Sequence, residues 1–212
     1  MAGRGPALAG LVVGLVLAIG PAGAGLSGLV PDTSTAPPPT APPAASTTAT
    51  SATSAATAAP AGPATPVRVR AGTVGLDAAV IPVGVRDDGQ MAVPERVAEV
   101  GWYRFGPAPG APAGSAVLAG HVDDRVQGEG AFADLGDLRP GDEVTVQGPG
   151  GPDDIVVHRV REVRTSSKEA LPLADLFRET GPAQLALVTC DGPFDTEARS
   201  YRDNLVVLAG PG

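Results

Sequence analysis

The sequence contains few cysteine, histidine and aromatic residues. It has one Cys and two His, and only 3% of its 212 residues are Phe, Trp or Tyr. A single cysteine excludes a disulfide within the monomer and any metal site built on several cysteines. Because no glycine-rich phosphate loop and no paired-carboxylate hydrolase motif stands out, we expect no cofactor and no bound metal.

Positive charge is also scarce. The chain has 15 Lys and Arg against 23 Asp and Glu, which gives a net charge of −8. After Arg4 no basic residue occurs until Arg68, and nearly all of the acidic excess lies beyond that point. Domains that bind nucleic acid present a clustered basic face, so this balance argues against a nucleic-acid partner.

The N-terminal residues 1–30 combine one arginine with an apolar run. Arg4 precedes the apolar residues 7–19, and the run continues more weakly to Val30. A basic start followed by an apolar core is typical of a cleaved export signal or of a single-pass anchor. Spanning a bilayer takes about 20 mostly apolar residues, and we favour the anchor. In either case the positive-inside rule keeps Arg4 in the cytoplasm and places the rest of the chain outside the cell.

Residues 31–66 are almost entirely Ala, Thr, Ser and Pro, with Asp32 as the only charged residue. Such a segment has too little large apolar surface to offset the entropy of ordering, so we predict a disordered linker. In polyproline II conformation it could reach roughly 110 Å at about 3.1 Å per residue. The remaining residues 67–212 have the length of one domain.

This domain is rich in short apolar or alternating runs separated by Gly and Pro. Their regular spacing, without a βαβ rhythm, predicts an all-β domain of about eight strands that forms a closed barrel or a sandwich. Two segments, 130–138 and 173–178, have the pattern of one or two short helical turns. The predicted strands cover residues 67–70, 78–85, 90–93, 115–120, 143–147, 155–164, 184–190 and 204–209.

Cys190 ends the apolar run 184–190 and is either a reactive nucleophile or a small buried apolar residue. Cysteine reacts as the thiolate, and an ordinary Cys with a pKa near 8.5 is only about 3% ionised at pH 7. A neighbouring base is therefore useful to a catalytic cysteine. His121 ends the buried run 115–120 and opens a polar loop, whereas His158 lies in the middle of a strand, so we favour His121.

An arginine beside such a thiolate could hold the oxyanion that forms when a carbonyl carbon is attacked. Arg202 comes directly before the last predicted strand, and we favour it over Arg199, which lies in the preceding loop. The acidic residues Asp123, Asp124 and Glu129 do not have the spacing of an EF-hand calcium loop, and we interpret them as solvated loop charges. On these residues alone, a Cys-His-Arg acyl-transfer site competes with an exported β-rich binding or structural module.

Six short motifs follow one another along the domain. They are residues 100–103 (VGWY), 119–123 (AGHVD), 132–135 (FADL), 138–144 (LRPGDEV), 187–190 (LVTC) and 201–207 (YRDNLVV). Taken together and in this order, they resemble the sortases, the cysteine transpeptidases of Gram-positive surfaces, and most of all the actinobacterial class E/F type. The resemblance covers residues 67–209. Ala186 departs from it, because many sortases have threonine there.

The resemblance implies an eight-stranded β-barrel and a covalent mechanism. It implies that Cys190 attacks the Thr–Gly amide of an LPxTG-like sorting signal and forms a thioester acyl-enzyme. His121 would be the general acid for the leaving amine and then the base for the incoming nucleophile. Arg202 would stabilise the oxyanion and orient the substrate, and Thr189, next to the nucleophile, would contact the substrate.

The same resemblance implies the partners. The acyl donor would be the sorting-signal peptide of a surface protein, and the acceptor an amine on a peptidoglycan precursor. We expect a monomer, held in the cell membrane by a single N-terminal span with its catalytic domain outside. A secreted cysteine peptidase that passes the thioester to water is a second possibility, and a non-catalytic exported β-barrel that binds ligands is a third.

Overall fold

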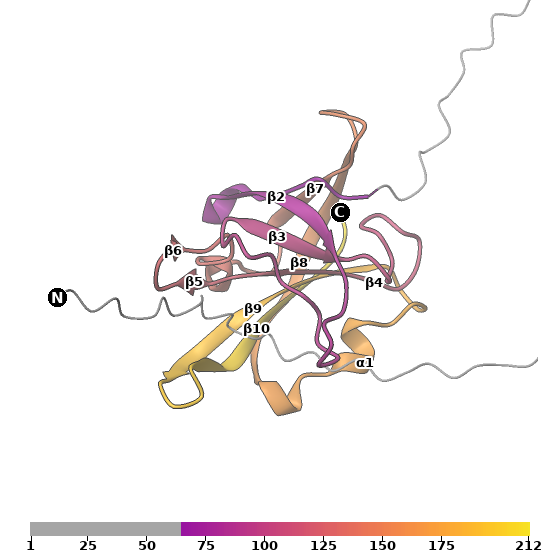
Figure 1. Ribbon diagram of the computed structural model, residues 1–212. Coiled ribbons are helices and arrows are strands. Elements are labelled where there is room, and N and C mark those ends of the chain that lie inside the picture. Colours follow the sequence, from indigo (N-terminus) through magenta and orange to yellow (C-terminus); the bar gives the residue numbers. More distant parts are fainter. Residues whose placement is uncertain (1–64) are drawn as a thin grey trace, which may run out of the picture. The chain divides into compact units, whose positions relative to one another are not determined.

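The computed structural model describes residues 65–212 (Figure 1). The anchor predicted at residues 1–30, and all but the last two residues of the linker predicted at 31–66, lie outside the described residues. Within the described part of the chain, no helix is both long and apolar enough to cross a membrane.

The described residues form strands joined by short helical segments, and the all-β prediction is confirmed. The strands are β1 (Arg68–Ala71), β2 (Leu76–Val83), β3 (Glu99–Tyr103), β4 (Ser115–Gly120), β5 (Asp123–Asp124), β6 (Gly128–Glu129), β7 (Glu143–Gln147), β8 (Ile155–Ser167), β9 (Gln184–Asp195) and β10 (Ser200–Pro211). The helical segments are η1 (Gly72–Val74), η2 (Leu135–Asp137), η3 (Lys168–Ala170) and α1 (Leu173–Leu176). Both predicted helical regions thus contain one short turn.

Eight of the strands close into a barrel in the order β1-β2-β3-β4-β9-β10-β8-β7. The β2–β3 and β4–β9 pairs are parallel, and the other pairs of the barrel are antiparallel. The closed barrel predicted from the resemblance is therefore confirmed. Strands β5 and β6 form a separate two-stranded ribbon just after β4.

The strand predicted at residues 90–93 is wrong. The chain makes only a single bridge there, between Val85 and Met91, around a turn in which the N–H of Gly89 donates to the carbonyl of Arg86. Since β2 pairs in parallel with β3, the chain must cross back over the barrel before it can form the next strand. A tight hairpin return cannot make that crossing, and β3 begins only at Glu99.

The last strands extend further than their apolar runs predict. Strand β9 continues past Cys190 to Asp195, and β10 begins at Ser200 rather than at Asn204. Figure 1 shows the far end of this β9–β10 hairpin reaching beyond the rest of the barrel. Pairing of backbone N–H and C=O groups does not require apolar side chains, so a polar hairpin end leaves no hydrophobic signal in the sequence.

The sheet that carries β4, β9 and β10 has a buried cluster on each face. The interior cluster includes Leu118, Leu187 and Leu205, together with Phe132 and Leu135 from the segment around η2, both 1% exposed. The outer cluster includes the strand residues Ala119, Val188 and Val206, covered by Met91, Leu171 and Leu176 from the segment after β2 and from around α1. Alternation along a strand therefore decides which cluster each neighbouring side chain joins.

Candidate active site

Cys190 lies in β9 just past the point where β4 stops pairing with that strand. The last pair of the parallel β4–β9 ladder is Ala119 with Val188, two residues before Cys190. Cys190 has the same parity as Val188, so its side chain lies on the outer face of the barrel, where it is 6% exposed. The thiol is thus nearly buried at the end of the β4–β9 ladder.

His121 follows β4 immediately and reaches the level of this cysteine. Carrying the parallel register two residues past Ala119 and Val188 brings His121 alongside Cys190. Two residues far apart in the sequence therefore lie at the same level, because their strands are neighbours. The sequence predicts that His121 follows a buried strand. In the structure this strand is β4, and it is the neighbour of β9, which carries Cys190.

The backbone around His121 is fixed by close packing. Its Nε2 atom lies 2.8 Å from the carbonyl oxygen of Pro94, and its own carbonyl accepts a 3.0 Å hydrogen bond from the N–H of Phe132. A Cβ at Gly130 would lie 2.2 Å from the His121 carbonyl oxygen, so only glycine fits there. Because the Pro94 carbonyl can only accept, Nε2 carries the proton, and Nδ1 is the nitrogen left to exchange one.

The thiol of Cys190 is neutral in the resting domain. Burial raises the pKa of Cys190, the positive charge of Lys168 lowers it, and the carboxylate of Asp123 raises it further. The nucleophilic form is the thiolate, so a base has to take the proton when a substrate reacts. The imidazole of His121 is the candidate base at this level of the sheet.

Tyr201 and Asp123 link the β9–β10 hairpin to the loop after His121. The Tyr201 hydroxyl donates a 2.7 Å hydrogen bond to Oδ2 of Asp123, and its ring packs edge-on against Phe194 at 5.2 Å between centroids. Burial, this bond to the carboxylate and the nearby Cys190 raise the pKa of Tyr201 to about 12. The phenol therefore stays protonated at neutral pH and keeps donating.

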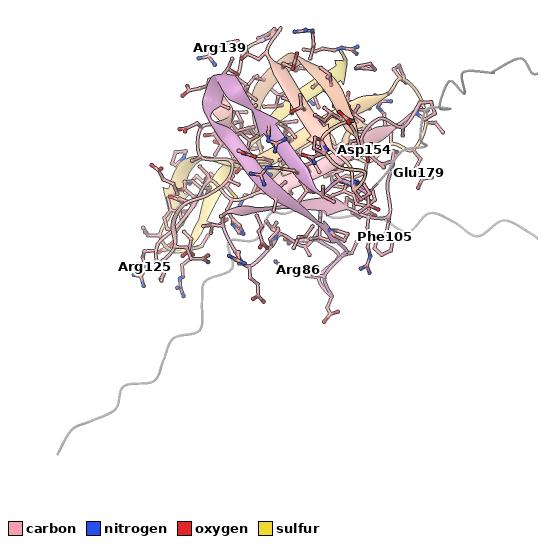
Figure 2. The ribbon with its side chains drawn as sticks, turned by 90° about the horizontal axis from the view of Figure 1, so that it is seen from above. Arg86, Phe105, Arg125, Arg139, Asp154 and Glu179 are labelled. Atoms are coloured by element: carbon pink, nitrogen blue, oxygen red, sulfur yellow. The ribbon has the colours of Figure 1, made fainter. Side chains whose placement is uncertain are left out.

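The other two residues of the predicted acidic cluster lie in the β5–β6 ribbon. Oδ1 of Asp124 accepts the backbone N–H groups of Val126 and Gln127, both at 2.8 Å, which makes it a turn former. Glu129 is exposed and pairs with Asp123 across the ribbon. Figure 2 shows Arg125, in the turn of this ribbon, on the outside of the domain. Among residues 65–212, no group of His, Cys, Asp and Glu is arranged to hold a metal ion.

Arg202 stands opposite a β-bulge in β9. The register shifts between Tyr201 and Asp203, so that the two β9 residues Gly192 and Pro193 face the single residue Arg202. Its side chain is 66% exposed, and Nη2 lies 3.3 Å from Oδ2 of Asp195 on the opposite strand. An exposed ion pair of this kind contributes little to stability, so the guanidinium can change partners at small cost.

Arg199 lies in the turn between β9 and β10. It is exposed and has a left-handed backbone with φ of 51°. This turn is organised by Asp195, whose Oδ1 accepts the N–H groups of Glu197 and Ala198 at 2.9 and 3.0 Å. The structure thus keeps both arginines on the hairpin that carries Cys190, with Arg202 closer to it along the ladder.

Thr189 is placed on the other side of the sheet from the cysteine. Its cross-strand partner is Leu205 of the interior cluster, and the residue is 1% exposed. Its side chain therefore points into the barrel, away from the outer face on which Cys190 lies. Oγ1 has no hydrogen-bond partner among the described residues.

Asn204 is the residue of this region that the sequence did not single out. It stands directly opposite Cys190 in the antiparallel β9–β10 ladder and is fully buried. In the sequence, Asn204 is recognisable only as a polar residue at the start of the apolar run 204–209. The extra residue in β9 also shifts the register by one, so counting from the hairpin turn would place Asn204 opposite Asp191 and not opposite Cys190.

His158, the second histidine, is far from this cluster in the fold. It pairs with Val144 of β7 and lines a cavity of about 260 Å³ with residues of the 107–114 loop and Pro211. It is 4% exposed, and burial lowers its pKa to about 4. The structure therefore sets His121 level with Cys190, keeps both arginines on the β9–β10 hairpin, and leaves His158 apart.

Comparison with known proteins identifies the family. Residues 70–211 match the sequence profile of the family described as "Sortase domain", while no curated protein sequence gives a significant match. Similar solved structures include sortase C-1 from Actinomyces oris, with 18% identity and a TM-score of 0.52 over 68% of this chain and 72% of that one. Sortase C1 from Streptococcus agalactiae has 20% identity and a TM-score of 0.52 over 68% and 66% of the two chains.

A sortase D5 transpeptidase from Clostridium perfringens has 18% identity and a TM-score of 0.50, over 68% of this chain and 77% of that one. At such low identities these structures establish the fold alone. The profile match covers residues 70–211, which is most of the chain, and it agrees with the barrel fold. The chain belongs to the sortase family.

Proposed function

We propose that this domain is a sortase-type cysteine transpeptidase that cleaves an LPxTG-like sorting signal and transfers the acyl group to an amine of the cell wall. Membership of a family of cysteine transpeptidases supports the reaction type. The observation that carries the proposal is the β4–β9 register, which brings His121 alongside the only cysteine of the chain.

In the proposed reaction, Cys190 is the nucleophile and His121 the proton carrier. As the substrate binds, the thiol proton passes to Nδ1 of His121, and the thiolate attacks the carbonyl carbon of the Thr–Gly amide. The C–N bond breaks, the amine leaves with the proton from His121, and a thioester on Cys190 remains. An acceptor amine then loses a proton to His121 and attacks the thioester carbonyl carbon. The C–S bond breaks, and the sulfur takes the proton from His121, which restores the thiol.

Arg202 is the proposed arginine of the site, and from its position in β10 it would orient the bound substrate. Its support is the position two residues from Asn204, the cross-strand partner of Cys190, and an exposed ion pair that is easily exchanged. Arg199 is the alternative. Thr189 stays a proposed substrate contact. Because its side chain points into the barrel, only its backbone can contact a substrate on the outer face.

The proposed location follows from the segments outside the described residues. Residues 1–30 would anchor the protein in the membrane, and the linker at 31–66 would carry the domain outward through the cell wall. Peptidoglycan amines and the sorting signals of surface proteins lie in that space. Retention of the full-length chain in the membrane fraction, and its release after removal of residues 1–30, would support this proposal.

The direct test is capture of the acyl-enzyme. The purified domain is incubated with peptides that carry LPxTG-like sequences, and intact mass spectrometry follows the protein. We expect a mass increase equal to the acyl fragment on wild-type protein and none on Cys190→Ala. Adding triglycine should convert the adduct into a ligated peptide. Release of the free acid alone would favour a peptidase, and no adduct across a broad peptide library would contradict the proposal.

A further inference from the structure

We infer that Asn204 supplies the hydrogen bond that stabilises the oxyanion during acylation of Cys190. This inference rests on the proposed function and assigns to a buried amide a part of the role expected from the sequence for Arg202. It concerns the step in which a carbonyl oxygen becomes negatively charged next to the cysteine sulfur.

The position of Asn204 is set by the sheet. It pairs with Cys190 of β9 on one side and with Ser166 of β8 on the other. Directly opposed residues of an antiparallel pair point to the same face, with Cβ atoms roughly 4.5–5.5 Å apart. The amide of Asn204 therefore stands beside the thiol on the outer face, on the side of Cys190 opposite to His121.

The side-chain amide of Asn204 makes no hydrogen bond within the described residues. Asn204 is fully buried, and neither Nδ2 nor Oδ1 has a hydrogen-bond partner among residues 65–212. A buried amide without a partner carries a desolvation penalty, which an apolar side chain of similar shape would avoid. The arrangement is explained if the partner is an atom of the bound substrate next to Cys190.

The amide of Asn204 is better placed than the guanidinium of Arg202 to donate a hydrogen bond to the oxyanion. A donor that stabilises a developing oxyanion acts most strongly when it is held in a fixed place that excludes water. Asn204 is held in the middle of a three-strand ladder, while the Arg202 side chain is 66% exposed and pairs with Asp195. Arg202 is left free to act on more distant groups of the substrate.

The sulfur of Cys190 forms a bond to the substrate carbonyl carbon, and the electron pair of the C=O π bond moves to the oxygen. Nδ2–H of Asn204 donates to that oxygen. When the C=O bond re-forms, the C–N bond breaks, the nitrogen takes a proton from His121, and the amide of Asn204 is unchanged.

The test compares two reactions of the same sulfur. Thioester formation from a sorting peptide passes through an oxyanion, whereas alkylation by iodoacetamide replaces iodide at an sp³ carbon and forms none. For Asn204→Leu we expect acylation to slow roughly a hundred- to a thousand-fold, as for other single oxyanion donors. Alkylation should stay within a few-fold of wild type, and the melting temperature should be equal or higher because an unpartnered amide has been removed.

Controls separate this role from the alternatives. Ser166→Ala changes the other neighbour of Asn204, away from Cys190, and should leave both rates within about twofold. Arg202→Ala should raise KM more than it lowers kcat. If Asn204→Leu does not fold, Asn204→Asp keeps the shape and removes the donor, and it should lose acylation equally or more.

Two outcomes overturn the inference. Acylation of Asn204→Leu at the wild-type rate shows that the amide is not needed, while the proposed function stands. An equal fall in acylation and alkylation shows that Asn204 acts on the thiol and not on the oxyanion. Absence of any adduct on wild-type protein that still reacts with iodoacetamide overturns the proposed function and this inference together.

Discussion

His121 and His158 are the two histidines of the chain, and the fold gives them different surroundings. His121 follows β4 alongside Cys190, with one ring nitrogen bound to the Pro94 carbonyl. His158 is buried on β8, and its ring nitrogens have no hydrogen-bond partner among the described residues. The first has the position of a proton carrier, and the second has that of a packing residue.

We therefore predict opposite effects of replacing the two histidines. His121→Ala should slow thioester formation by roughly a hundred- to ten-thousand-fold, since it removes the proposed general acid and base. His158→Leu, which keeps a side chain of similar bulk, should stay within about twofold of wild type. Rates are measured by intact mass on protein with a confirmed melting transition. Comparable losses in both variants, with both folded, would mean that His158 is the functional histidine.

Gly130 lies in the segment before η2, and this segment packs directly on the backbone of His121 at the end of β4. The close approach of Gly130 to the His121 carbonyl leaves no space for a Cβ. The hydrogen bond from Phe132 to that carbonyl holds the same segment in place. The position of the imidazole thus depends on a loop that contributes no side chain to the site.

Gly130→Ala should accordingly displace His121 and lower both the melting temperature and kcat. Gly136→Ala is the matched control: its Cβ would meet only a Leu205 methyl at 3.6 Å, an ordinary contact. We expect Gly136→Ala to leave rate and melting temperature close to wild type. Measuring kcat and thermal unfolding for both variants checks this, and an active, stable Gly130→Ala would show that the loop does not position His121.

The domain as a whole should lose stability as the solution is acidified, because His158 is buried without charge. Burial lowers the pKa of His158 from 6.5 to about 4 in the folded domain. Between these pH values the unfolded chain binds a proton that the folded domain does not bind. The free energy of unfolding therefore falls as pH falls through this window.

At about 1.4 kcal/mol for each pKa unit, this histidine should cost the domain about 3 kcal/mol of stability by pH 4. In His158→Leu that loss should be absent, while the contribution of the carboxylates remains. Denaturant unfolding of both proteins at several pH values gives the difference. Parallel curves for the two proteins between pH 4 and 6.5 would contradict the prediction.

Much of the barrel could be predicted from the sequence. Runs such as 115–120 and 184–190 contain enough consecutive apolar residues to identify buried strands, and helical turns at 130–138 and 173–178 follow from local spacing. The missed strand β3 (Glu99–Tyr103) and the polar ends of β9 and β10 could not be predicted. Their pairing depends on backbone partners supplied by distant parts of the chain.

The sequence by itself left Cys190 as the only candidate for a nucleophilic cysteine, and it favoured His121 as its partner because His121 directly follows a buried strand. The tertiary structure alone decided what lies beside them. Parallel pairing of β4 with β9 set His121 level with Cys190, and the bulge in β9 at residues 192–193 shifted the register so that Asn204 lies buried opposite Cys190. Strand order and register join residues far apart in the chain, and one extra residue in a strand changes every facing beyond it.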